Sequence, residues 1–233
     1  MKTPPLIAEI VGASGTGKST LSETLNGRGQ KIRAGITVWG LPLRQLLIGG
    51  FLTLPALLVL YMERRGFRRG EIRQIIRLDA LYRLLKKEIR AGNAAECRTA
   101  LFMDEGIVFA LAKLHADSSD AGKENGEVMR RWEVDALDRW ARILGAIVWM
   151  DAPDELLAGR INTRAKDHRM KDKPGGEVRE FLARYRASYE RIIAELQTRS
   201  DRIEVISFRT DRDSPEEMTD EILRYIEARG PFA

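Results

Sequence analysis

The chain has 233 residues, 44% of them hydrophobic, which is enough to bury a substantial core in one α/β domain. Its 39 basic and 34 acidic side chains leave a formal net charge of +5, which suits phosphorylated ligands or an anionic membrane surface and gives little support for nucleic-acid binding. Cys97 is the only cysteine, so an internal disulfide is excluded and we expect a reducing, cytoplasmic compartment. We expect no secretory signal, because the N-terminal apolar run reads as a strand and no small-residue cleavage site follows a basic start.

Residues 12–19, GASGTGKS, have the spacing G-x-x-x-x-G-K-[ST] of a phosphate-binding loop. An apolar run before them predicts a buried strand, and Leu21 and Leu25 after them predict one face of a short helix. In such a loop, glycines allow the backbone N–H groups to surround an anion, and the helix N-terminus adds partial positive charge. Lys18 would bridge the β- and γ-phosphates of a nucleotide, and the Ser19 hydroxyl would hold Mg²⁺. The expected nucleotide-binding residues of this loop are Gly12, Ala13, Ser14, Gly15, Thr16, Gly17, Lys18, Ser19 and Thr20.

Strands and helices are predicted to alternate along the rest of the chain. Apolar runs predict strands over 5–11, 31–38, 99–104, 145–150 and 202–207. Helical spacing of apolar residues predicts helices over 71–91, 127–144, 177–199 and 215–228. The first of these helices has a basic side opposite its apolar side, and the polar stretch 113–126 predicts a surface loop. This alternation predicts an α/β fold with a parallel sheet covered on both faces.

An uncharged apolar stretch, 46–62, follows the second predicted strand. Its length is at the lower edge for a membrane span, where roughly 20 residues are usual, and Gly49, Gly50 and Pro55 would break it into short helices. Three interpretations stay open. The stretch forms a buried helix pair, it forms a homodimer interface or an apolar pocket, or it docks with the arginines after it, as 46–69, on an anionic membrane surface. Those arginines are Arg64, Arg65, Arg68, Arg69 and Arg73.

The predicted strand over 99–104 ends in Asp104 and Glu105. P-loop enzymes place a carboxylate near Mg²⁺ at such a position, and the carboxyl ends of parallel strands meet at one edge of a sheet. Asp104 is therefore expected to contact Mg²⁺ or to orient an acceptor hydroxyl, and Glu105 is a second candidate for either role. Asp104 would also suit the N-cap of the helix that begins at Gly106, and the two roles are compatible.

Basic residues follow the predicted strand over 145–150. Arg160 and Arg164 are four residues apart on the predicted helix after Pro153 and would share a face, and Arg169 follows in a basic stretch. Arginines that close over a transferring phosphoryl group stabilise its charge and exclude water. The pattern predicts an arginine lid over about 157–176, and a solvated basic surface is the alternative interpretation.

At this point the chain resembles the P-loop kinases of the nucleotide and nucleoside kinase group, most of all the thymidylate kinases. The resemblance lies in the phosphate-binding loop, in the strand-to-lid segment with its three arginines, in Tyr185 and Tyr189, and in 207–216, where that family holds the adenine ring, with Arg209 as a contact. It implies a P-loop three-layer sandwich with five parallel strands in the order 2-3-1-4-5, a helical lid, ATP as donor and Mg²⁺ as cofactor. It also implies a single kinase domain over 1–233, with an acceptor-binding insertion over about 39–98.

The chain departs from that family on the acceptor side. Glu105 stands where the family has an arginine that contacts the acceptor phosphate, and Val11 stands where it has an acidic residue. A carboxylate at position 105 would repel a phosphate, so a non-nucleotide hydroxyl group is a candidate acceptor. For the chain as a whole we expect an ATP-dependent kinase that transfers the γ-phosphate to a small-molecule hydroxyl or phosphate acceptor. The alternatives are a nucleoside monophosphate kinase, a membrane-associated kinase acting on an apolar acceptor, and an ATP-binding regulatory module with no acceptor.

Overall fold

The computed structural model describes residues 5–28, 32–37, 47–48, 51, 53–54, 69–91, 100–119, 127–165 and 167–229. Five parallel strands form its sheet, in the order β2-β3-β1-β4-β5, which confirms the expected fold. The strands are β1 (Leu6–Val11), β2 (Ile32–Ile36), β3 (Ala100–Met103), β4 (Ala146–Asp151) and β5 (Glu204–Arg209). In the central register Ala8 of β1 lies between Phe102 of β3 and Ala146 of β4, and all six residues of β1 are buried.

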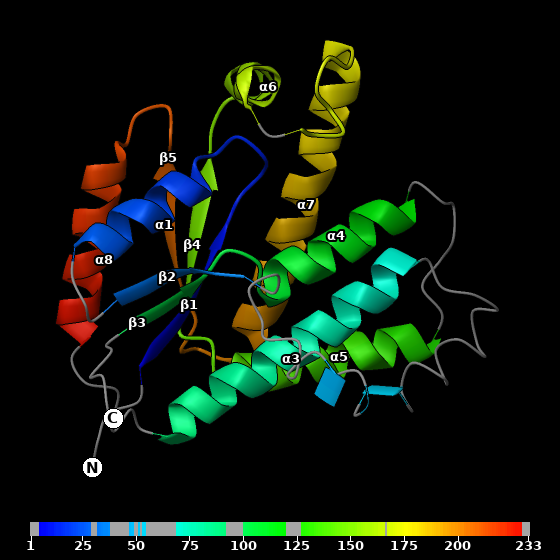
Figure 1. Ribbon diagram of the computed structural model, residues 1–233, viewed down its shortest axis with the longest axis vertical. Helices are drawn as coiled ribbons and strands as arrows, with labels where there is room; N and C mark the ends of the chain where they lie inside the picture. Colours follow the sequence, from blue (N-terminus) through cyan, green and yellow to red (C-terminus); the bar gives the residue numbers. More distant parts are fainter. Residues whose placement is uncertain are drawn as a thin grey trace.

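Helices cover both faces of the sheet, as Figure 1 shows. They are α1 (Lys18–Gly27), α3 (Arg69–Ala91), α4 (Ile107–Ser119), α5 (Glu127–Ala141), α6 (Asp154–Thr163), α7 (Gly175–Arg199) and α8 (Pro215–Arg229). Helices α1 and α8 pack on one face and α3, α4, α5 and α7 on the other, while α6 lies above the carboxyl ends of the strands.

Strand alternation in β1 explains the two layers of core. Leu6, Ala8 and Ile10 point to the face that α1 and α8 cover, and they pack with buried leucines, methionine and isoleucine of those helices. Ile7 and Val11 point to the other face, into the larger cluster formed by α3, α4, α5 and α7. A strand whose side chains are buried on both faces reads as a continuous apolar run, which is why the sequence reveals it.

The predicted helices form with ends within a few residues of those expected, but one predicted loop is wrong. The stretch 113–126 was expected to be a loop, whereas α4 continues to Ser119, and residues 120–126 lie outside the described part. Leu114 and Ala116 are buried, because Leu111 and Leu114 continue the apolar face of α4 one turn further. The polar residues of the stretch concealed the helix, whose buried apolar side chains there are Leu114 and Ala116.

The described residues of the apolar stretch 46–62 have helical backbone but are mostly exposed. Leu47, Ile48, Phe51 and Leu54 are 65%, 47%, 77% and 49% exposed, and Thr53 is buried. A buried helix pair therefore does not account for these four side chains. Among the residues that the structure describes, no helix combines the length and apolarity that crossing a membrane requires.

Candidate functional site

The phosphate-binding loop lies between β1 and α1, at the carboxyl edge of the sheet. Gly15 and Gly17 have φ values of 92° and 88°, in the left-handed region that glycine adopts without strain. Gly12 approaches β4 so closely that a Cβ atom there would lie 2.3 Å from the backbone oxygen of Met150. The loop thus depends on glycine for its conformation and for its packing, as the motif predicts.

Lys18 begins α1 and turns back over the loop. Its Nζ donates hydrogen bonds to the carbonyl oxygens of Gly12 at 2.7 Å and Ala13 at 3.0 Å. Removal from water lowers the pKa of Lys18 to about 8, the Asp104 carboxylate opposes this, and the Arg164 cation adds to it. The structure therefore brings Lys18, Asp104 and Arg164, from three separate segments, into one electrostatic environment.

Asp104 follows β3 and faces α1. Its Oδ1 accepts a hydrogen bond of 2.6 Å from the Ser22 hydroxyl, and its pKa is raised by burial, against the effects of Ser22 and Lys18. Ser22 lies one helical turn after Ser19, so the hydroxyls of both serines occur on neighbouring turns of α1. In the described part of the chain no three His, Cys, Asp or Glu side chains form a metal-binding group. The Ser19 hydroxyl and the Asp104 carboxylate could hold Mg²⁺, because this ion takes oxygen ligands, keeps several waters and binds substrate phosphates.

Asp104 does not cap α4, contrary to the N-cap expectation. The side chain of Glu9, from β1, accepts the hydrogen bonds of the N-terminal N–H groups of this helix instead. The fully buried Glu9 carboxylate accepts backbone N–H hydrogen bonds from Gly106, Val108 and Phe109 at 2.9, 3.0 and 2.9 Å. A Cβ atom on Gly106 would lie 2.5 Å from Glu9 Oε2, so only glycine leaves room for the carboxylate. Glu9 therefore fixes the backbone immediately after Asp104 and Glu105. The sequence analysis missed this residue, and its only local signal is a charged residue within an apolar strand.

Arg160 and Arg164 both reach the phosphate-binding loop, although they do not share a helical face. The helix α6 ends at Thr163, and Arg164 has extended backbone with φ −66° and ψ 144°. Arg160 donates to the carbonyl of Gly15 at 3.1 Å and to the hydroxyl and carbonyl oxygens of Thr210, both at 2.9 Å. Arg164 donates to Ser14 Oγ at 2.9 Å.

These groups enclose a cavity of about 540 Å³. Its lining consists of residues 14–20 from the loop and the start of α1, and of Arg160 and Arg164 from the lid segment. Thr210 and Asp213 of the β5–α8 connection and Pro215 and Met218 of α8 complete it. A cavity that joins a phosphate-binding loop, two arginines and a third segment is large enough for a nucleotide.

Arg169 and Arg209 do not line this cavity among its described residues. Arg169 lies over the aromatic rings of α7, 4.7 Å from the centroid of Phe181, and donates to the Tyr185 hydroxyl at 3.4 Å. Arg209 turns toward Asp211, to which its Nε donates at 3.1 Å. The segment expected near an adenine ring does reach the cavity, through Thr210 and Asp213.

Arg186 of α7 is a structural residue that the sequence did not reveal. Its guanidinium donates to both carboxylate oxygens of Asp151, at the end of β4, at 3.1 Å each, and to Asp154 of α6 at 2.8 Å. These bonds tie the start of α6 to α7 and so help to place Arg160. No single segment carries this signal, because the arginine and the carboxylates lie more than 30 residues apart.

Glu105 lies near a cation of α3. Partial burial and the nearby Arg73 lower the pKa of Arg77, and the Glu105 carboxylate opposes this. The positive charge of Arg77 therefore acts on the carboxylate that the sequence suggested would repel an acceptor phosphate.

The fold matches known kinases, although sequence comparison alone finds no relative. No protein-family model matches the chain, and no curated protein sequence matches it significantly. Thymidylate kinase from Candida albicans superposes with a TM-score of 0.61 at 12% identity, covering 98% of this chain and 94% of that one. Deoxyadenosine kinase from M. mycoides, with dCMP and dCDP bound, superposes with a TM-score of 0.56 at 14% identity, covering 96% and 100%. The same enzyme with dCTP gives 0.54 at 12% identity. The chain therefore has the fold of the P-loop nucleoside and nucleotide kinases over nearly its whole length.

Proposed function

We propose that this protein is an ATP-dependent phosphotransferase that moves the γ-phosphate to a hydroxyl or phosphate group of a small molecule. The cavity of about 540 Å³ carries the proposal, because it joins the phosphate-binding loop to two arginines of a separate segment. A loop that only bound nucleotide would not need arginines placed over its phosphates, whereas phosphoryl transfer develops charge that such arginines stabilise.

The side chains of the loop and lid would have different roles in binding ATP and in stabilising the transferred phosphoryl group. Lys18 now donates to two backbone carbonyls and would exchange them for the β- and γ-phosphate oxygens, which also favour its charged form. Arg164, held by a single bond to Ser14, is the arginine better placed to follow the transferring group. Arg160 makes three bonds to neutral acceptors and would chiefly hold the loop and the β5–α8 connection together.

Asp104 and Glu105 are proposed to serve the acceptor and the metal. Mg²⁺, held by Ser19 and Asp104, would neutralise phosphate charge. Burial raises the pKa of Asp104, which makes its carboxylate a better proton acceptor for a hydroxyl group than an exposed one. Glu105 remains the second candidate for that role.

A nucleoside monophosphate kinase is the second candidate function. The Arg77 cation, whose charge acts on Glu105, favours it, because it would offset the repulsion between this carboxylate and an acceptor phosphate. The acceptor region itself is proposed to lie in the insertion over about 39–98 of a single domain, and the described residues of that range include α3.

The test is ADP release from ATP and Mg²⁺ in the presence of nucleosides, nucleoside monophosphates, sugars and lipid-linked alcohols. Release that depends on one added compound supports a kinase, and the Lys18→Ala variant should lose it. ATP binding without release, for every compound, would favour a regulatory module and contradict the proposal. Release with hydroxyl compounds but not with monophosphates would exclude the second candidate.

A further inference from the structure

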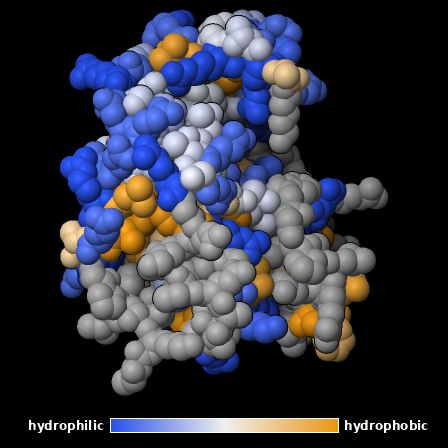
Figure 2. All heavy atoms as spheres, turned by 60° about the vertical axis from the view of Figure 1, so that its left-hand side comes forward, coloured by the Kyte–Doolittle hydropathy of each residue, from blue (hydrophilic) through white to orange (hydrophobic). Residues whose placement is uncertain are grey.

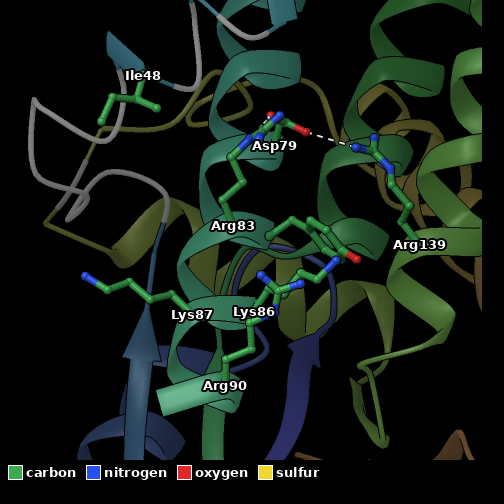
Figure 3. Close-up of a pocket in the computed structure, with 8 residues that line it drawn as sticks. Ile48, Asp79, Arg83, Lys86, Lys87, Arg90 and Arg139 are labelled. Carbon is green, nitrogen blue, oxygen red and sulfur yellow. Dashed lines mark hydrogen bonds and ion pairs between the residues drawn. The ribbon is translucent and has the colours of Figure 1, made fainter.

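A second cavity, of about 650 Å³, lies between α3 and α5 and is strongly cationic. Its described lining includes the five cations Arg83, Lys86, Lys87, Arg90 and Arg139 and a single carboxylate, Asp79. Figure 3 shows the α3 side chains along one side of the helix and Arg139 reaching across from α5 toward Asp79. None of these residues lines the nucleotide cavity.

The one carboxylate is already engaged. Asp79 is buried and accepts from Arg83 at 2.7 Å and from Arg139 at 3.0 Å, so it fixes two cations at the rim of the cavity. Lys86 lies over the Tyr82 ring, 5.8 Å from its centroid, and Lys87 and Arg90 are exposed. Buried leucines and Ile75 form the side of α3 that packs on the core, so the cationic side chains lie on the side turned away from the sheet. An excess of four positive charges in one hollow needs a polyanionic partner or water.

One exposed apolar side chain lines the same cavity, and three more follow or precede it closely in the sequence. Ile48 belongs to its lining, and Leu47, Phe51 and Leu54 lie within six residues of it. In the described part of the chain, large apolar side chains that are exposed number six, and these four belong to one segment. The upper part of the face in Figure 2, where α6 lies, is by contrast largely hydrophilic.

We infer that this surface docks the protein on an anionic phospholipid membrane, with the α3–α5 cations against the headgroups and the exposed side chains of Leu47, Ile48, Phe51 and Leu54 at the acyl boundary. Cations beside exposed aliphatic and aromatic side chains match the two layers of such an interface. A second copy of the chain fits less well, because a two-fold contact through this face would bring cations against cations. A nucleic acid would meet the cations but leave the leucines and isoleucine without an apolar partner. The inference does not depend on the proposed kinase activity.

The experiment is co-sedimentation of the full chain with phosphatidylcholine vesicles that contain or lack phosphatidylglycerol, without ATP. We expect sedimentation only with the anionic vesicles, and much less at high salt, where screening shortens the reach of the cations. The variant Lys87→Glu/Arg90→Glu should weaken binding by at least about 25-fold, at roughly fivefold for each cation removed. Leu47→Ser/Phe51→Ser should also weaken binding, and because these side chains are exposed both variants should keep the circular dichroism of the wild type.

The matched control is Arg33→Glu/Arg224→Glu, which makes the same change in charge at exposed positions of β2 and α8. It should bind anionic vesicles nearly as the wild type does. Equal loss in control and test variants would reduce the effect to net charge and overturn the inference. Equal sedimentation with neutral vesicles, or no sedimentation at all, would also overturn the inference. Full competition by inorganic phosphate would overturn it too, because it would indicate a site for a soluble anion. So would a concentration-dependent dimer that the test variants abolish.

Discussion

Glu9 shows how one buried carboxyl group organises the carboxyl edge of the sheet. Its carboxylate accepts three backbone hydrogen bonds from the first turn of α4, yet burial raises its pKa from 4.5 to about 7. The folded state therefore binds a proton that the unfolded state releases between these two values. The associated stability is complete below pH 4.5 and is lost as the pH rises through about 7.

Replacing this carboxyl group tests that linkage. We expect the difference in unfolding free energy between the wild type and Glu9→Gln to fall by about 3 kcal/mol between pH 4.5 and pH 8, because glutamine does not titrate. Urea unfolding at several pH values measures it, and the raised pKa values of Asp104 and Glu133 cancel in the difference. A difference that is constant with pH would show that Glu9 is charged throughout.

Gly106 is the residue that admits the Glu9 carboxylate. Gly106→Ala should destabilise the protein by about 1–3 kcal/mol and lower the turnover number, because the new Cβ must displace Glu9 and with it the backbone of Asp104 and Glu105. Gly159→Ala in α6 is the control, since no atom lies within 4 Å of the Cβ position there. Thermal unfolding and steady-state kinetics of both variants check this, and equal effects would contradict it.

The two lid arginines should differ in kinetics. Arg164→Ala should lower the turnover number on the order of 10²-fold with little change in KM for ATP, as expected of a group that acts on the transition state. Arg160→Ala should mainly raise KM for ATP, because its three bonds hold the loop against Thr210. Lys173→Ala, at an exposed lid position, serves as control. The assignment fails if the two arginine variants have the same kinetic profile.

At the scale of elements, local periodicity predicts the helix faces and helix caps, because residues close in the sequence determine them. The stripe of α7, from Val178 to Leu196, and the capping of α8 by Ser214 follow the sequence closely, because neighbours in the chain determine them. Glu9 and Arg186 could not be assigned in this way, since their partners lie 97 and 35 residues away. The lid prediction combined both kinds of information. Arg160 and Arg164 reach the phosphate-binding loop, but Arg169 packs on α7 instead, and the end of α6 before Arg164 was not predicted.

Arg186 links two elements and predicts a coupled loss. In Arg186→Met, Asp151 and Asp154 would face each other without their cation, so we expect a destabilisation of about 1–3 kcal/mol. Because α6 carries Arg160, the affinity for ATP should fall as well. Arg179→Met, at an exposed position of the same helix, should change neither property. Denaturant unfolding measures the stability and ATP titration measures the affinity. A loss of stability with unchanged affinity for ATP would show that the position of α6 does not affect the ATP site.

At the scale of the whole molecule, two of the cationic cavities among the described residues bear on nucleotide binding. One is the phosphate-binding loop at the carboxyl edge of the sheet, and the other is the α3–α5 cavity, which shares no described lining residue with it. ATP is a polyanion, so charge alone would draw it to either. Only the loop combines a lysine at the centre of backbone N–H groups with ligands suited to Mg²⁺, and the two regions therefore differ in metal dependence.

Thermal stability distinguishes the two regions. ATP at about 100 times its Kd should stabilise the folded state by about 2.7 kcal/mol, which corresponds to a rise in Tm of roughly 5–10 °C for a chain of this size. The rise in Tm should require Mg²⁺ and should disappear in Lys18→Ala, because that variant lacks the positive charge at the phosphate-binding loop. Lys87→Glu/Arg90→Glu should keep the full rise, since these side chains line only the other cavity. If Lys18→Ala retained the rise and the α3 variant lost it, ATP would bind between α3 and α5, and the loop would have to serve another anion.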